Sequence, residues 1–175
     1  MPPRPLSPRR SLLACALALS AAGIFASVPL AHAETLGPNL IQNPSFESGS
    51  SGAPTAWKQG GYGDNARTFT YPASPAHTGA RAAKVAITRY GSGDAKWYFP
   101  AVPIEGGASY RFSDWFTATV PSEVDVQVTH ANGSTSYIVL AHPAAASAYA
   151  AVSIAFTVPS DATAVTIFHV INSVG

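Results

Sequence analysis

Hydrophobic residues recur at every second position through most of this chain, whereas the three-to-four-residue period of helices is nearly absent. Between 122 and 130, valines occupy positions 124, 126 and 128, and polar residues fill the positions between them. Between 150 and 158, Val152, Ile154 and Phe156 alternate with smaller or polar residues. This alternation predicts strands with one face buried and the other in contact with water or a ligand.

Weaker alternation predicts further strands, and turn-forming residues separate them. These strands are expected at 67–71, 81–88, 94–99, 108–117, 135–140 and 163–171, with a short strand pair at 39–41 and 45–47. Turns are expected at 60–63, 91–93, 105–107, 132–133 and 159–161, and Asn132-Gly133 predicts a tight hairpin. The alanine-rich segment 143–151 is interpreted as a loop or a single helical turn. Many short strands with glycine- and proline-rich turns favour an all-β, antiparallel β-sandwich or jelly roll.

The N-terminal segment has the order of a secretory signal peptide. Arg4, Arg9 and Arg10 precede an apolar run that ends at Ala31-His32-Ala33, a small-x-small cleavage pattern. A membrane anchor is the alternative, because the apolar run is nearly long enough to span a bilayer. Arg9-Arg10 also allows twin-arginine export in place of the general secretory route. We expect residues 1–33 to be removed, so that the protein is secreted without a membrane attachment.

The remaining segment, 34–175, is expected to fold as one domain without a disulfide. Cys15, the only cysteine of the 175 residues, leaves with the signal. Without the three N-terminal arginines, seven basic residues remain against nine acidic ones. This balance provides neither a basic stripe for nucleic acid nor a polybasic patch for membranes. The chain stops in a turn directly after a predicted strand, and we expect the sandwich to lack its last strand.

Catalytic motifs are missing from the sequence. There is no Gly-x-Ser-x-Gly, no His-Glu-x-x-His, no phosphate loop and no dinucleotide fingerprint. A carboxylate pair for glycoside cleavage is conceivable, but the acidic residues lie in turns or on predicted solvent faces. The segment is therefore not expected to be an enzyme.

The aromatic residues are more informative. Sugars pack their apolar C–H faces on aromatic rings, and their hydroxyls need polar partners. Trp115 shares a predicted strand face with Arg111, Ser113 and Thr117, and is interpreted as a sugar platform or, alternatively, as a packing residue. The full set of candidate ligand-binding residues is Trp115, Tyr98, Lys96, Tyr62, Tyr90, Gln127, Tyr137 and His169. Of these, His169 lies in a strand apolar on both faces, a position also typical of a core histidine.

Other residues are assigned to the interior. Trp97 and Phe99 are predicted to be core, opposite Lys96 and Tyr98, and Trp57 is predicted to be a packing residue. Asp114 falls on the apolar face of its strand, and a buried carboxylate needs a partner. We expect a bulge that turns Asp114 outward or a structural ion pair, for example with Lys96.

Several segments resemble a known family. The opening Asn39-Leu40-Ile41-Gln42-Asn43-Pro44-Ser45-Phe46-Glu47, followed by Trp57, is similar to galactose-binding-like jelly-roll domains, especially carbohydrate-binding modules of families 4 and 9. The segments 93–99, 110–114 and 168–173 resemble a variant attached to secreted bacterial polysaccharide deacetylases and glycoside hydrolases. The resemblance covers 39–175 and implies a β-sandwich that binds a polysaccharide. It also implies a structural calcium with Glu47 as a ligand.

These observations favour a secreted, non-catalytic carbohydrate-binding module that anchors to a polysaccharide by aromatic stacking and hydrogen bonds. Two alternatives remain open. In the first, the chain is an accessory segment of a secreted hydrolase whose catalytic domain lies downstream. In the second, it is an extracellular protein-binding or adhesion domain, because one fold hosts unrelated functions.

Overall fold

The computed structural model describes residues 36–50 and 52–175, and residues 38–175 form one compact unit built from strands. The expected signal peptide lies outside the described residues. No helix occurs in the part that the structure describes, so none there is long and apolar enough to cross a membrane. The strands are β1 (Gly49–Ser50), β2 (Ala53–Pro54), β3 (Lys58–Tyr62), β4 (Asn65–Ala73), β5 (Ala82–Tyr90), β6 (Asp94–Tyr98), β7 (Val102–Pro103), β8 (Ser109–Ala118), β9 (Glu123–His130), β10 (Thr135–Ala141), β11 (Ala146–Thr157) and β12 (Ala162–Val170).

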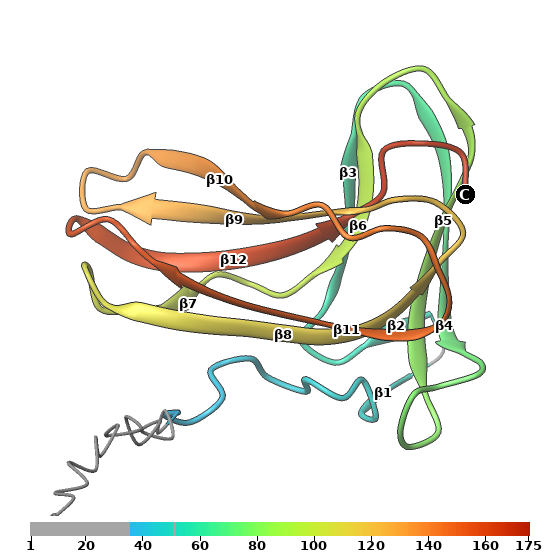
Figure 1. Cartoon of the computed structure of the whole chain (residues 1–175), viewed down its shortest axis with the longest axis horizontal. Helices are drawn as coiled ribbons and strands as arrows, with labels where there is room; N and C mark the ends of the chain where they lie inside the picture. The colour runs from blue at the N-terminus through green and yellow to red at the C-terminus, as the bar shows by residue number, and fades with distance from the viewer. Residues whose placement is uncertain (1–35, 51) are drawn as a thin grey trace, which may run out of the picture. The chain divides into compact units, whose positions relative to one another are not determined.

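Two layers of antiparallel strands enclose the core, which confirms the predicted β-sandwich. One layer has the order β10-β9-β12-β7, and the β8–β11 pair lies across from it (Figure 1). Ile171, directly after β12, exchanges two backbone hydrogen bonds with Ala95 of β6, which joins the β3–β6 pair to the first layer. The β4–β5 hairpin forms a further pair, and Ile87 of β5 exchanges two backbone hydrogen bonds with Gly175.

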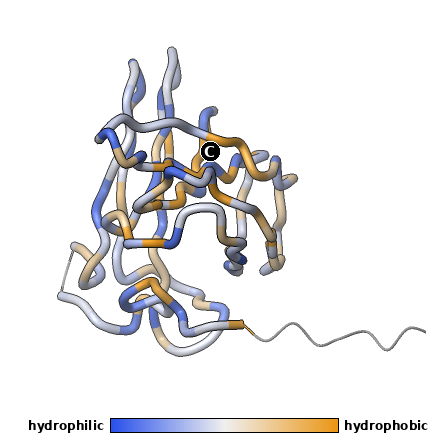
Figure 2. Tube along the Cα trace, turned by 90° about the vertical axis from the view of Figure 1, so that its left-hand side faces the viewer, coloured by the Kyte–Doolittle hydropathy of each residue, from blue (hydrophilic) through white to orange (hydrophobic). Residues whose placement is uncertain are grey.

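The core follows the period-two pattern of the sequence. Val124, Val126 and Val128 of β9 are fully buried, while Glu123, Asp125 and Gln127 between them are partly exposed. Figure 2 shows apolar and polar residues interspersed along the chain. Phe112 of β8 is buried on the facing layer and belongs to the same cluster. Full burial of one such side chain contributes about 1.5–3 kcal/mol, so these rows hold the layers together.

The N-terminal segment differs from the sequence prediction. The strand pair expected at 39–41 and 45–47 is wrong, because the chain there winds around the side chain of Asn43. Asn43 Nδ2 donates to the carbonyls of Ser48 and Thr55, and its Oδ1 accepts the N–H of Ser48. Asn43 and Phe46 have φ values of 51° and 61°, which an extended strand does not allow.

Two other predictions are corrected. Gly60-Gly61-Tyr62 lies within β3 and is not a turn, and the alanine-rich segment 143–151 enters β11 at Ala146. In both cases, pairing with a neighbouring strand overrides local propensity. The Asn132-Gly133 hairpin is confirmed: the N–H of His130 donates to Ser134, and Gly133 has a φ of 82°.

Candidate functional site

An open cleft of about 560 Å³ lies on the outer side of the layer that contains β9 and β12. Its lining comes from five strands that are far apart in the sequence. The lining residues are Gln59, Gly60, Gly61 and Tyr62 of β3, Lys96 and Tyr98 of β6, Gln127 of β9, Tyr137 of β10 and Phe168 of β12. Five of the eight predicted ligand-binding residues are therefore brought together: Tyr62, Lys96, Tyr98, Gln127 and Tyr137.

Four aromatic rings line the cleft, those of Tyr62, Tyr98, Tyr137 and Phe168. Phe168 is only 7% exposed and forms the base, with Tyr98 edge-on at 5.7 Å and Tyr137 stacked at 6.3 Å between ring centroids. Tyr137 is 62% exposed and Tyr62 is 68% exposed, so both tyrosines present ring surface to solvent. The amide of Gln127 donates to the hydroxyl of Tyr137, which fixes the direction of that ring.

The polar centre of the cleft is a lysine with a compensated charge. Lys96 Nζ lies 2.7 Å from Asp94 Oδ1. It also lies 4.7 Å from the ring centroid of Phe168 and 5.8 Å from that of Tyr62. The side chain of Lys96 is 13% exposed and that of Asp94 14%, so screening by water is weak. This ion pair and the two cation–π contacts hold the ammonium group in place.

Two glycines, Gly60 and Gly61, line the cleft, and Gly60 makes room for the ring of Tyr98. In the β3–β6 register, Gly60 lies opposite Lys96 and Tyr62 opposite Asp94. A Cβ on Gly60 would lie 2.8 Å from Cε1 of Tyr98, too close for the ring to keep its position. The sequence interpretation assigned these glycines to a turn and therefore missed them, together with Gln59 and Phe168.

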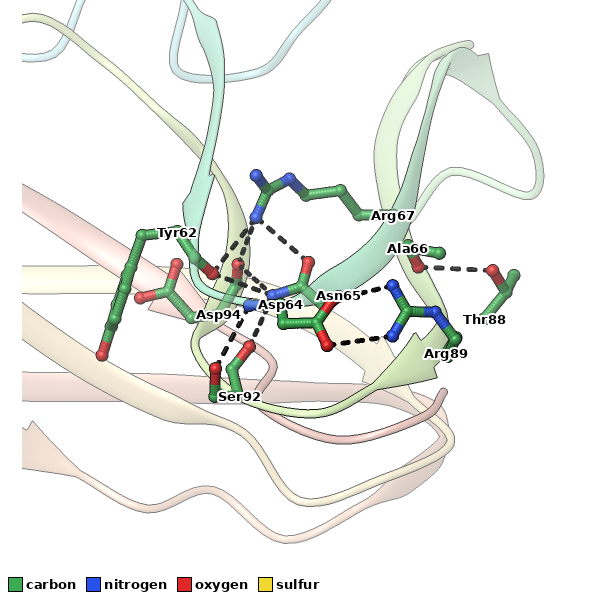
Figure 3. A network of polar contacts seen from close by, with 9 residues as sticks. All are labelled: Tyr62, Asp64, Asn65, Ala66, Arg67, Thr88, Arg89, Ser92 and Asp94. Atoms are coloured by element: carbon green, nitrogen blue, oxygen red, sulfur yellow. Dashed lines mark hydrogen bonds and ion pairs between the residues drawn. The ribbon is translucent and has the colours of Figure 1, made fainter.

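A polar network fixes the ends of β3 and β6 beside the cleft (Figure 3). Asn65 Nδ2 donates to the carbonyls of Tyr62 and Ser92, and Arg67 Nη1 donates to those of Tyr62 and Asp94. Because these bonds reach backbone oxygens on both strands, they set the separation of Tyr62 and Asp94. A bidentate pair between Asp64 and Arg89 closes the outer edge of the network.

An acidic pair continues the polar face of β9 beyond Gln127. The pKa of Asp125 is raised to about 6, chiefly by burial and then by the nearby Glu123 and Asp94, while Lys96 opposes the shift. Asp125 Oδ1 is buried and has no hydrogen-bond partner among the described residues. The carboxyl group of Asp125 therefore favours its protonated form more than an exposed aspartate does.

Three predicted binding residues lie outside the cleft. Tyr90 ends β5 and is 39% exposed. Trp115 lies on β8, in the opposite layer, and is 54% exposed. His169 points between the layers, where Nδ1 lies 2.8 Å from Asp114 Oδ2 and Nε2 lies 2.8 Å from Ser122 Oγ.

The partner of Asp114 corrects the sequence prediction. A structural pair was expected and is found, but the partner is His169, whereas Lys96 pairs with Asp94. Lys96 and Asp114 lie on different layers. The side chain of Lys96 points outward into the cleft, whereas that of Asp114 points inward to His169, so the two cannot pair. The predictions for Trp97 and Phe99, at 7% and 3% exposure, are confirmed. Trp57 is confirmed as a packing residue, with its ring 4.4 Å from that of Phe46.

Serine, histidine and aspartate meet at two places in the structure. Around His169 the serine, Ser122, is 5% exposed and out of reach of a substrate. Around His130, Nδ1 lies 3.0 Å from Asp161 and Nε2 lies 2.7 Å from Ser136. A hydrolase needs an accessible nucleophile and oxyanion donors as well as this order of groups. Here the bonds tie β8 to β12, and the β9–β10 hairpin to the turn before β12.

Glu47, the predicted calcium ligand, is already engaged. Its Oε1 accepts the N–H groups of Ala80 and Arg81, both at 3.0 Å. No group of three or more His, Cys, Asp or Glu residues suited to a metal occurs in the described part of the chain. One carboxylate is fewer than most calcium sites use, so backbone carbonyls, hydroxyls and water would have to provide the other oxygens. Calcium at Glu47 stays a prediction.

Comparisons with known proteins agree with this fold. Solved structures show the fold: the family 11 carbohydrate-binding module of the Clostridium thermocellum cellulase Lic26A-Cel5E has a TM-score of 0.53 and 12% identity, over 81% of this chain and 90% of that one. The family 22 module of Xyn10B from the same organism has a TM-score of 0.51 and 15% identity, over 75% and 83%. The enzymatically active domain of bacteriophage CBA120 tailspike protein 4 has a TM-score of 0.57 and 16% identity, over 78% of this chain but 20% of that one.

Sequence comparison is more selective. No curated protein matches the chain. A family model described as a carbohydrate binding domain, of the family 4 and 9 type, matches residues 38–173, which is nearly the whole compact unit. The chain belongs to this family of carbohydrate-binding domains.

Proposed function

We propose that the chain is a secreted, non-catalytic module that holds a polysaccharide in the cleft. The observation that supports this most is the convergence of Tyr62, Tyr98 and Tyr137 with Lys96 and Gln127 on one open surface. Exposed ring faces take the C–H faces of sugars, while the ammonium and amide groups bond to hydroxyls. The family 22 module of Xyn10B, which shares the fold, has a cleft with amino acids studied for their role in ligand binding, and this supports the choice of a cleft as the binding site.

The charge of the cleft favours a neutral chain of sugars. Asp94 compensates Lys96, so the pair offers donors and an acceptor without a net charge. A strongly anionic polymer would meet the carboxylates of Asp125 and Glu123 beside the cleft. Affinity per module is expected to be modest, because each sugar hydroxyl exchanges one hydrogen bond with water for one with protein.

The test is a binding panel with matched variants. The folded protein is incubated with cellulose, xylan, chitin and peptidoglycan, and the bound fraction is measured beside that of Tyr137→Ala and the control Tyr90→Ala. We expect retention on at least one polymer, weakened by Y137A and unchanged by Y90A, since Tyr90 lies outside the cleft. A folded protein that none of the four polymers retains would contradict the proposal.

Export and attachment belong to the same proposal. The pattern of residues 1–33 supports export with cleavage before Glu34, and mass spectrometry of the exported protein would test the new N-terminus. The module would anchor an enzyme encoded downstream and so raise the local concentration of its substrate. Extending the reading frame beyond Gly175 tests this part separately.

A further inference from the structure

A second exposed aromatic surface lies on the layer opposite the cleft. Along β8, Phe112 and Asp114 point inward, to the core and to His169, whereas Trp115 points outward and is 54% exposed. The cleft lies on the outer side of the other layer, on β9, β12 and their neighbours. Side chains on the outer sides of two packed layers point away from each other. One sugar chain in the cleft therefore cannot also lie along Trp115 without passing around the module.

A loop distant in sequence holds the Trp115 ring from one side. His77, in the connection between β4 and β5, stacks on it with 4.0 Å between centroids and 10° between planes. Tyr149 contacts His77 edge-on at 5.3 Å, and its hydroxyl donates to the carbonyl of Pro75 at 2.7 Å. Tyr149 lies at the register shift of β11 between Ala146 and Ala150. These contacts fix the ring before any ligand arrives, which lowers the entropy cost of binding.

The surface around the ring is low and polar. Trp115 lies opposite Ala151, and its neighbour along the strand face, Ser113, lies opposite Ser153. Alanine and serine side chains are short, so the indole stands above these neighbours, whereas the exposed Arg111 on the same face donates to Ser153 Oγ at 3.4 Å. The two hydroxyls lie about 7 Å along the strand from the ring, at the spacing of two strand residues.

A sugar fits this surface better than a protein partner does. Among the described residues of β8 and β11, Trp115 is the one exposed large hydrophobic side chain. A stable protein interface buries about 800 Å² on each side around a well-packed apolar centre, which one ring among serines and alanines does not supply. A pyranose needs one flat ring face and a few hydroxyl partners.

We propose that Trp115, supported by His77, is a second carbohydrate-contact site that packs on the apolar face of a pyranose ring in a polysaccharide. With the cleft, it gives one module two sites that face away from each other. The module then bridges two polysaccharide chains and does not only hold one. The Trp115 site rests on its own contacts, whereas bridging also rests on the function proposed for the cleft.

The test measures bridging and single-site binding side by side. An insoluble polymer that retains the protein is mixed with a fluorescent soluble form of the same polymer, and the label that sediments with the solid is measured. We expect the native protein to carry label down, and both Trp115→Ala and Tyr137→Ala to lower the sedimented label at least fivefold. Each single variant still binds the solid through its other site, whereas the double variant binds both the solid and the soluble polymer more weakly than either single variant.

A second variant separates recognition from packing. Ala151 is exposed beside the ring, so Ala151→Gln covers the indole without removing its contact with His77. We expect A151Q to keep the native melting temperature and to lose bridging as Trp115→Ala does. If A151Q and a folded W115A both sediment as much label as the native protein, Trp115 only anchors the loop and the second site is refuted. Failure of Y137A alone to weaken binding would instead contradict the cleft.

Discussion

The cleft and the Trp115 surface are both aromatic and exposed, but the chain builds them in different ways. The cleft draws its lining from five strands, and Phe168 at its base is buried beneath the exposed tyrosines. The Trp115 surface lies on the two strands β8 and β11 and is supported by a ring from a loop. The cleft also contains an ion pair and has acidic neighbours, whereas the exposed residues of β8 and β11 include no carboxylate.

This difference separates two uses of an exposed ring. Where several strands provide rings and polar groups around one hollow, a sugar chain meets many contacts at once, and affinity is concentrated there. A single supported ring offers one contact. It contributes to affinity mainly when another site of the same module is bound as well. Loss of a cleft residue is therefore expected to weaken binding more than loss of Trp115.

The largest effect is expected where the two layers are tied together. Asp114→Ala removes the hydrogen bond from β8 to His169 of β12 and leaves a mostly buried imidazole without that partner. The free energy of unfolding should fall by about 2 kcal/mol, measured by urea denaturation. Ser122→Ala, which removes the other partner of His169, is the control and should cost less. An unchanged urea midpoint for D114A would mean that the hydrogen bond between Asp114 and His169 does not stabilise the packing of the two layers.

The next effect concerns the cleft itself. Tyr137→Ala removes an exposed ring and the partner of Gln127, and should weaken oligosaccharide affinity about 10-fold in calorimetry. Trp115→Ala should change the affinity of the tighter site, the cleft, by no more than about twofold. A factor of 10 in affinity corresponds to about 1.4 kcal/mol, and a single ring remote from the cleft supplies less. Equal losses in both variants would abolish the distinction between the two surfaces.

Calcium would affect the loop that supports His77, because Glu47 holds Ala80 and Arg81 in the same connection. If the predicted ion binds, a chelator should lower the melting temperature by a few degrees and excess calcium should restore it. Glu47→Gln keeps an oxygen for the two amides but loses the charge, so its melting temperature should not respond to the chelator. If the native protein melts at the same temperature with and without chelator, calcium does not bind at Glu47.

The smallest effect is a pH dependence that belongs to the cleft side alone. Because the pKa of Asp125 is raised from 3.8 to about 6, the folded state holds this proton more tightly than the unfolded state does. Its contribution to stability is present below about pH 4 and is lost as pH rises through about 6. Asp125→Asn should therefore raise the melting temperature slightly at pH 8 relative to the native protein, and little at pH 4.

The control for this effect is Glu105→Gln, at an exposed position away from the cleft. The gain in melting temperature between pH 4 and pH 8, relative to the native protein, should be larger for D125N than for E105Q. If the pH-dependent difference in melting temperature is no larger for D125N than for E105Q, burial does not raise the pKa of Asp125.

The period-two pattern by itself determined the layers and which residues form the core. Alternation on β9 placed its valines inside and Gln127 outside, because a strand has two faces and burial selects the apolar one. The same logic put Lys96 and Tyr98 opposite Trp97 and Phe99. The strand prediction failed where the hydrogen bonds of a single side chain replace strand pairing, as those of Asn43 do in the N-terminal segment.

Only the tertiary structure decided which exposed rings share a surface. A strand pattern gives the face of a residue but not the order of strands, so the sequence could not show that Trp115 and Tyr137 lie on different surfaces. The order β10-β9-β12 and the link from Ile171 to β6 bring Tyr137 to Lys96, while Trp115 lies on the other layer. Gly60 and Phe168 were missed for the same reason: their roles depend on a neighbour from a distant strand, which no local pattern specifies.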